Sequence, residues 1–205
     1  MTNHVLQLNW LNNKKSLLCT APKKLDKFQN QGIQQVSLVV TDDFKGLEQM
    51  ISQAYPFAKQ QRCFIHISRN LDSKVKQSDW TVILKQFKTF YRAENLEIAV
   101  QALEDFIAEW KPKYRKVMES PENTDNLLTF YQFPYQIWHS IYSTNLIESL
   151  DKEIKRQTKK KVLFPNEEAL DRYLVTLFKD YNFKQSQRIH NGFGQCSDTL
   201  ESLFD

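Results

Sequence analysis

The sequence predicts an α/β chain in which a few short strands come first and a long helical block follows. Three observations support this prediction: a β-branched apolar run at residues 35–40, a helical spacing of apolar residues from about residue 80, and only four glycines in 205 residues. Because average glycine usage is about 7%, the chain has little material for the tight turns of an all-β fold. We therefore expect a helix-rich protein.

Composition excludes several classes of protein. Hydrophobic residues at 41% and charged residues at 25% are typical of a globular chain and not of a disordered one. Cys19, Cys63 and Cys196 are too few and too scattered for a disulfide framework, and no 18-residue apolar stretch occurs. The glycine-rich phosphate loops, the nucleophile elbow of hydrolases and the zincin motif are absent. We expect a cytoplasmic protein without a membrane partner.

The predicted strands lie in the first seventy residues. Residues 35–40 are entered through Gly32 and have the apolar pattern of a strand that is buried on both faces. Residues 44–54 follow with helical spacing, and Tyr55-Pro56 ends that helix. Three weaker elements accompany them, an edge strand, a helix and a further strand, at residues 5–10, 22–29 and 62–67.

Helices dominate from about Trp80 onward. One amphipathic helix is clear, because apolar residues recur along one face until Pro112 ends it, at Ala99, Leu103, Phe106 and Trp110. After a turn-rich linker at residues 121–125, further helices are predicted at residues 127–131, 135–142, 145–161 and from the cap Asn166 onward. The chain then divides into a strand-bearing core, a helical insertion, a return to the core and a loose tail, at residues 1–70, 71–141, 142–190 and 191–205.

Two carboxylates are candidates for chemistry. Asp42 follows the buried strand, and open α/β sheets place functional groups at the carboxyl ends of their strands. The alternative is that Asp42 or Asp43 only caps the helix that follows. Glu148 begins a helix on which a row of lysines continues along the same face, at Lys152, Lys155 and Lys159.

The helix that begins near Glu148 is strongly basic. Between residues 151 and 161, two acidic residues stand against six basic ones: Lys152, Lys155, Arg156, Lys159, Lys160 and Lys161. Such an excess can follow a phosphate backbone, and a net charge of +4 allows an anionic partner. A solvated helix face is the alternative. Carboxylates beside cations suit metal-assisted phosphodiester chemistry, because Mg²⁺ needs hard oxygen ligands and cations hold the strand.

Cys63 and His66 have the spacing of half a zinc site. Tetrahedral zinc needs further ligands, and the other suitable pair, His190 and Cys196, is more than a hundred residues away. The simpler interpretation is a buried thiol and a hydrogen-bonded imidazole at the end of a strand.

Four blocks of this sequence, in this order, resemble the Mutator-type transposases of bacterial insertion sequences. They are VTDDFKGL at residues 40–47, QRCFIHISRN at 61–70, YSTNLIESL at 142–150 and FPN at 164–166. The resemblance implies a partial RNase H-like fold, with a mixed sheet flanked by helices and an all-helical insertion between the second acidic residue and the last. It also implies an Asp-Asp-Glu triad that binds Mg²⁺ or Mn²⁺ for cleavage and transfer of DNA strands. Asp42 matches the second member, Glu148 the third, and Cys63 and His66 a supporting pair.

The sequence also departs from the family's pattern. Before Val40 the only acidic residue is Asp26, in a predicted helix, so we expect an N-terminally truncated member that lacks the first catalytic Asp. Asp43 and Asp151 replace a usual Gly and Asn. One hypothesis is a transposase that acts on double-stranded DNA and can form a homo-oligomer. The alternatives are an inactive remnant that binds only DNA or intact transposase, and a helical DNA-binding regulator unrelated to transposition.

Overall fold

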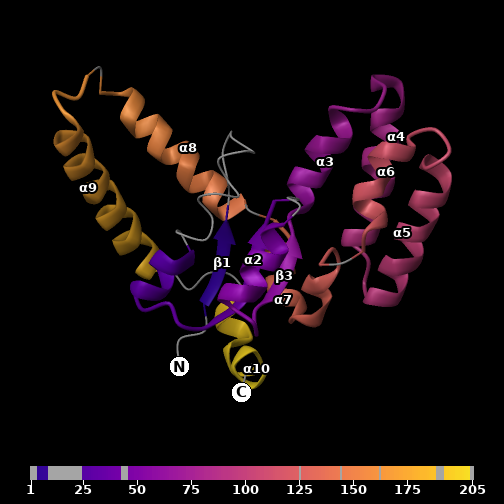
Figure 1. Cartoon of the computed structure of the whole chain (residues 1–205), viewed down its shortest axis with the longest axis horizontal. Coiled ribbons are helices and arrows are strands. Elements are labelled where there is room, and N and C mark those ends of the chain that lie inside the picture. The colour runs from indigo at the N-terminus through magenta and orange to yellow at the C-terminus, as the bar shows by residue number, and fades with distance from the viewer. Residues whose placement is uncertain are drawn as a thin grey trace.

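A computed structural model describes residues 4–8, 25–42, 46–124, 126–143, 145–161, 163–187 and 192–203. It is a mixed α/β structure, mostly helical, with a three-stranded sheet at its centre (Figure 1). The strands lie in the order β1-β2-β3, with bounds His4–Leu8, Val36–Thr41 and Lys59–Arg62. Both pairings are parallel, so the described part of the sheet contains none of the antiparallel pairs that a mixed sheet has.

The central strand β2 separates two hydrophobic cores. All six of its residues are buried, which confirms the prediction of a strand covered on both faces. Because side chains alternate along a strand, Val39 belongs to one core and Leu38 and Val40 to the other. The smaller core is closed by the helical residues 25–30 and by α2 (Leu47–Ala54), both predicted from the sequence.

The prediction of a strand at residues 62–67 is wrong. The strand β3 ends at Arg62, and α3 (Phe64–Asp72) begins two residues later. A helix forms at these residues because Phe64, Ile67 and Leu71 share one face at helical spacing, and all three are buried. The true strand is polar, and its buried Gln61 amide bonds to Leu127 and Phe130 instead of packing as an apolar side chain would.

The helical block predicted from Trp80 onward is confirmed. Its elements are α4 (Gln77–Tyr91), α5 (Leu96–Trp110), α6 (Arg115–Glu122), the 3₁₀ helix η1 (Thr129–Gln132) and α7 (Tyr135–Ile141). Helix α6 occupies part of the predicted linker and carries Pro121 in its last turn.

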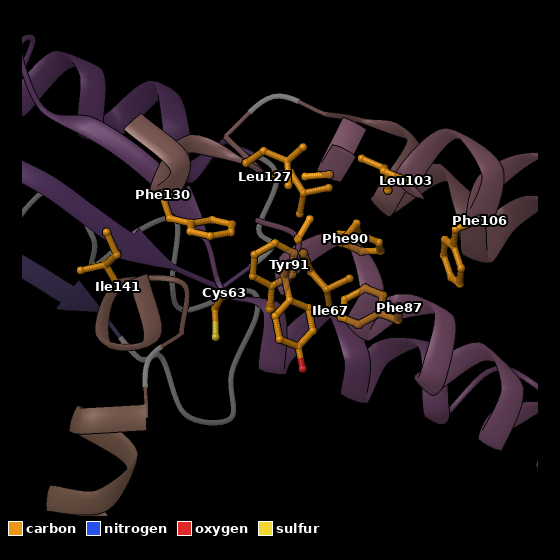
Figure 2. Packing of buried hydrophobic residues seen from close by; sticks show 14 of the residues in the cluster. Cys63, Ile67, Phe87, Phe90, Tyr91, Leu103, Phe106, Leu127, Phe130 and Ile141 are labelled. Carbon is orange, nitrogen blue, oxygen red and sulfur yellow. The ribbon is translucent and has the colours of Figure 1, made fainter. Parts of the chain in front are cut away.

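An aromatic core joins this block to the sheet (Figure 2). Phe64 lies at the junction, and its ring centroid is 5.0 to 5.9 Å from those of five other rings, in Phe87, Phe90, Tyr91, Phe130 and Tyr142. Edge and tilted contacts of this kind add to the free energy gained by burying the rings. The helical block is therefore fixed against the strand ends.

Two long helices, α8 (Asn145–Lys159) and α9 (Glu167–Ser186), extend on the other side of the sheet from α4, α5 and α6 (Figure 1). The predicted cap of α9 is confirmed, because Asn166 Oδ1 accepts a hydrogen bond from the Ala169 amide at 2.8 Å.

The segment predicted as a loose tail is folded where the structure describes it. It forms η2 (Phe193–Gln195) and α10 (Ser197–Ser202), and Cys196 is buried in the aromatic core. Gly192 permits the close approach to α7: its φ is +94°, and a Cβ atom there would lie 2.2 Å from the Gln136 carbonyl oxygen.

Candidate active site

Asp42 lies directly after the central strand, at the carboxyl edge of the sheet. Its side chain is buried, with 7% of its surface exposed. Gly46 precedes the next helix at the cap position, so Asp42 does not hold the place that the capping alternative assigns to it. Asp43 lies outside the described residues.

His66 stands between Asp42 and Glu148. It occupies the first turn of α3, with Nδ1 2.8 Å from Asp42 Oδ1 and Nε2 3.9 Å from Glu148 Oε1. Asp42 Oδ1 is buried and accepts no well-aligned hydrogen bond from the described residues, despite the short distance to the ring. One imidazole therefore links two carboxylates that are more than a hundred positions apart in the sequence.

The surroundings of His66 favour its protonated form. Burial alone would lower its pKa, but the close contacts with the Asp42 carboxylate and with Cys63 outweigh burial and raise the pKa of His66 to about 10. At neutral pH the imidazolium places a positive charge between Asp42 and Glu148. This charge reduces the repulsion that two carboxylates at one site would otherwise feel.

Glu148 is held by a second cation from the same helix. Arg69 Nη1 and Nη2 donate to Glu148 Oε1 and Oε2, each at 2.8 Å. This hydrogen bonding is the main reason that the pKa of Glu148 lies below its usual range. His66 and Arg69 are three residues apart on α3 and so share one face.

Cys63 lies immediately before α3, next to the strand end that carries Asp42. Its side chain is fully buried, and its amide donates to the Thr41 carbonyl oxygen at 2.7 Å, which fixes the start of α3 beside Asp42. The described residues form no group of three or more potential metal ligands, and His190 lies outside them. The geometry matches a buried thiol and a hydrogen-bonded imidazole, on a helix and not at a strand end.

The six basic residues predicted to bind DNA are all exposed on α8 or just after it. Two of them have partners: Arg156 forms a double hydrogen bond with Glu153, and Lys161 lies 5.0 Å from the centre of the Tyr173 ring. The other four form no ion pair with another described residue: Lys152, Lys155, Lys159 and Lys160. We call Lys152, Lys155 and Lys159 the α8 ridge.

Comparison with known proteins decides the family. The family model described as "Transposase, Mutator family" matches residues 21–186. The chain belongs to this family. It is 89% identical over 181 residues to the transposase for insertion sequence element IS905 of Lactococcus lactis, covering 88% of this chain and 46% of the relative. It is 36% identical to the IS1201 transposase of Lactobacillus helveticus, covering 76% of this chain and 45% of the relative.

This member of the Mutator family thus spans less than half the length of the curated relatives it matches. No helix in the described parts of the chain is long and apolar enough to cross a membrane.

One residue of the site escaped prediction from the sequence. Arg69 lies within the block QRCFIHISRN, and a strand at residues 62–67 gives it no relation to His66. The signal that could have found it is the three-residue spacing from His66, which has meaning only on a helix.

The donor atoms fit a divalent cation in part. Mg²⁺ is usually held by one or two carboxylates together with water and substrate phosphates, and Asp42 and Glu148 supply two such carboxylates. A cation would also satisfy the buried Asp42 Oδ1, which lacks a well-aligned hydrogen bond among the described residues. His66 and Arg69 neutralise these carboxylates in the structure, so a bound metal ion would take over part of their role.

Proposed function

We propose that this chain carries part of the catalytic centre of a DNA transposase that cuts and transfers DNA strands with the help of divalent metal ions. One observation carries the proposal: Asp42, at the end of the central buried strand, and Glu148, at the start of α8, both contact the imidazole of His66. An acidic residue at the end of a central strand also suits the RNase H-like fold that we propose for the complete core.

In this proposal Asp42 and Glu148 hold Mg²⁺ or Mn²⁺. The bound cation would supply the Lewis acidity that activates a water or a 3′-hydroxyl and stabilises the leaving oxygen. His66 keeps the Asp42 carboxylate oriented through the contact at 2.8 Å. Arg69 keeps Glu148 beside it until metal and DNA arrive.

Double-stranded DNA is the proposed substrate, and the α8 ridge is its proposed binding surface. The ridge begins one helical turn after Glu148, so a backbone bound along α8 would lead to the carboxylates. We propose Lys160, Lys161 and Arg156 as further contacts at the far end. Because both ends of an element must be cut for it to move, we also propose a homo-oligomer, which sedimentation of the chain with DNA can test.

The experiment is metal-dependent cleavage of a duplex that carries the element's own terminal sequences. We expect cleavage by the unsubstituted chain in Mn²⁺ or Mg²⁺ and its loss in both Asp42→Asn and Glu148→Gln. Glu97→Gln and Asp105→Asn remove exposed carboxylates of α5 and serve as matched controls that keep activity. Equal cleavage by the site variants would refute the proposed roles. Salt-sensitive DNA binding without cleavage would favour the inactive remnant instead.

A further inference from the structure

Helix α4 presents a long basic face that the proposed site does not use. An open groove of about 670 Å³ runs along this helix and its C-cap residue Arg92. Its lining residues recur at helical spacing on one side: Trp80, Thr81, Leu84, Lys85, Lys88, Thr89 and Arg92. The opposite side of α4 carries the buried residues that pack into the aromatic core. We call the groove with its three cations the α4 groove.

The cations of the α4 groove pair with no acidic residue that the structure describes. Lys85, Lys88 and Arg92 form no ion pair with another residue in the described part of the chain. The one acidic residue in the sequence of α4 is Asp79, which is already paired with Lys113 at 2.6 Å and bonded to the Tyr114 hydroxyl. Three cations along about two helical turns, left without carboxylates, make a surface that attracts a polyanion.

The α4 groove begins close to the proposed active site. The Arg92 guanidinium lies 5.8 Å from the centre of the Tyr91 ring, and Tyr91 lies 5.2 Å from Tyr142. Tyr142 lies three positions before the first residue of α8, and its carbonyl oxygen accepts a hydrogen bond from the amide of Phe64, the first residue of α3. The Arg92 end of the groove therefore lies near the starts of α3 and α8, the helices that carry His66 and Glu148.

We propose that the α4 groove binds the phosphate backbone of double-stranded DNA, as a second contact surface in addition to the α8 ridge. This inference rests on the proposed function, because DNA is the polyanion that the site would act on. Lys85, Lys88 and Arg92 contact successive phosphates, while the apolar side chains between them pack against the sugars. The helical insertion thereby holds a stretch of DNA that the sheet and α8 alone do not reach.

The test is the salt dependence of binding to a duplex of arbitrary sequence, followed by fluorescence anisotropy with the 205-residue chain. The variant K85Q/K88Q/R92Q removes the three charges and keeps good helix formers at these positions. The control K74Q/R115Q/K116Q removes the same charge from exposed positions in other parts of the helical block. The variant K85R/K88R/R92K retains the charges, and thermal melts of all three show whether the fold is kept.

We expect K85Q/K88Q/R92Q to weaken binding by about tenfold or more and to reduce the slope of log K against log salt by about 3. The control and the charge-retaining variant should stay within about twofold of the unsubstituted chain. If K85Q/K88Q/R92Q binds as well as the control, the α4 groove is not a DNA surface, while the proposed function stands. If the unsubstituted chain binds no DNA, the proposed function fails and this inference fails with it.

Discussion

Arg69 donates a hydrogen bond to Glu148 from each of its two terminal nitrogens, and each nitrogen lies 2.8 Å from a different carboxylate oxygen. The fork of a guanidinium matches a carboxylate and a phosphate equally well. Arg69 thus holds Glu148 in place in the absence of metal and DNA, but it also occupies the two oxygens that a metal ion would use. The pair both positions Glu148 and competes with its proposed ligand.

Replacing Arg69 should strengthen metal binding. In Arg69→Gln the metal no longer displaces a cation from Glu148, so we expect Mn²⁺ to bind about two- to fivefold more tightly, since Arg69 is half exposed and such pairs contribute little energy. Calorimetric titration of metal-free protein measures the affinity. Arg172→Gln breaks an exposed pair on α9 and is the control. Unchanged or weaker binding in Arg69→Gln would show that Arg69 does not compete with metal.

Gln61 should matter for stability more than its polar nature suggests. Its buried amide donates to the Leu127 carbonyl oxygen and accepts from the Phe130 amide, at 2.7 and 2.8 Å, which fastens β3 to the segment before α7. Gln61→Ala leaves these buried groups without partners, so we expect the free energy of unfolding to fall by about 2 to 4 kcal/mol. Urea denaturation measures this change.

Gln101→Ala is the matched control for Gln61→Ala, because Gln101 is exposed and its amide donates to Asp105 within the same helix, α5. We expect its effect on the free energy of unfolding to remain within about 0.5 kcal/mol. Equal effects of the two substitutions would mean that Gln61 does not tie the sheet to the helical block.

The carboxyl group of Glu153 should titrate in strong acid. Hydrogen bonds from Arg156, followed by one from Gln157, lower its pKa from the usual 4.5 to about 2. Because the pKa is lower in the folded state, the stabilisation of α8 by this pair is present above about pH 4.5 and is lost as the pH falls through about 2. Carbon NMR of the carboxyl groups measures the midpoint, and Arg156→Gln should raise it toward 4.5. A midpoint near 4.5 in the unsubstituted chain would refute the pairing.

Local patterns predicted the elements whose burial is simple. The strand β2 is apolar at nearly every position because both of its faces are covered, so a short β-branched run was a sufficient signal. Helix α5 has one buried face, and its four buried residues are those that the periodicity selected, at Ala99, Leu103, Phe106 and Trp110.

Prediction failed where long-range contacts decide the structure. Arg62 is buried because its guanidinium donates to carbonyl oxygens of Ser120 and Asn123, far away in the sequence, so β3 lacks the apolar pattern of a strand. The apolar run after it was then interpreted as the strand. Cys196 is likewise buried in the aromatic core, next to the close approach of Gly192 to Gln136. No local sequence pattern predicts this approach.

The same error concealed part of the site. Asp42 and Glu148 could be selected from the sequence because one follows a strand and the other begins a basic helix. In a strand, however, residues three apart point to opposite faces, whereas in a helix they share a face. With residues 62–67 interpreted as a strand, His66 and Arg69 could not be expected to act together.

The parallel pairing of β1, β2 and β3 restricts the order in which the chain can fold. Parallel neighbours cannot be joined by a tight hairpin, so each pairing closes a long loop, and α8 returns to the sheet only after the whole helical block. Helices α4 and α5 are neighbours in the sequence and pack against each other, and contacts between close sequence neighbours form fastest. We expect the helical block to form first. Its folding shortens the stretch of unfolded chain between Asp42 and Glu148, so the two carboxylates meet in the last step of folding.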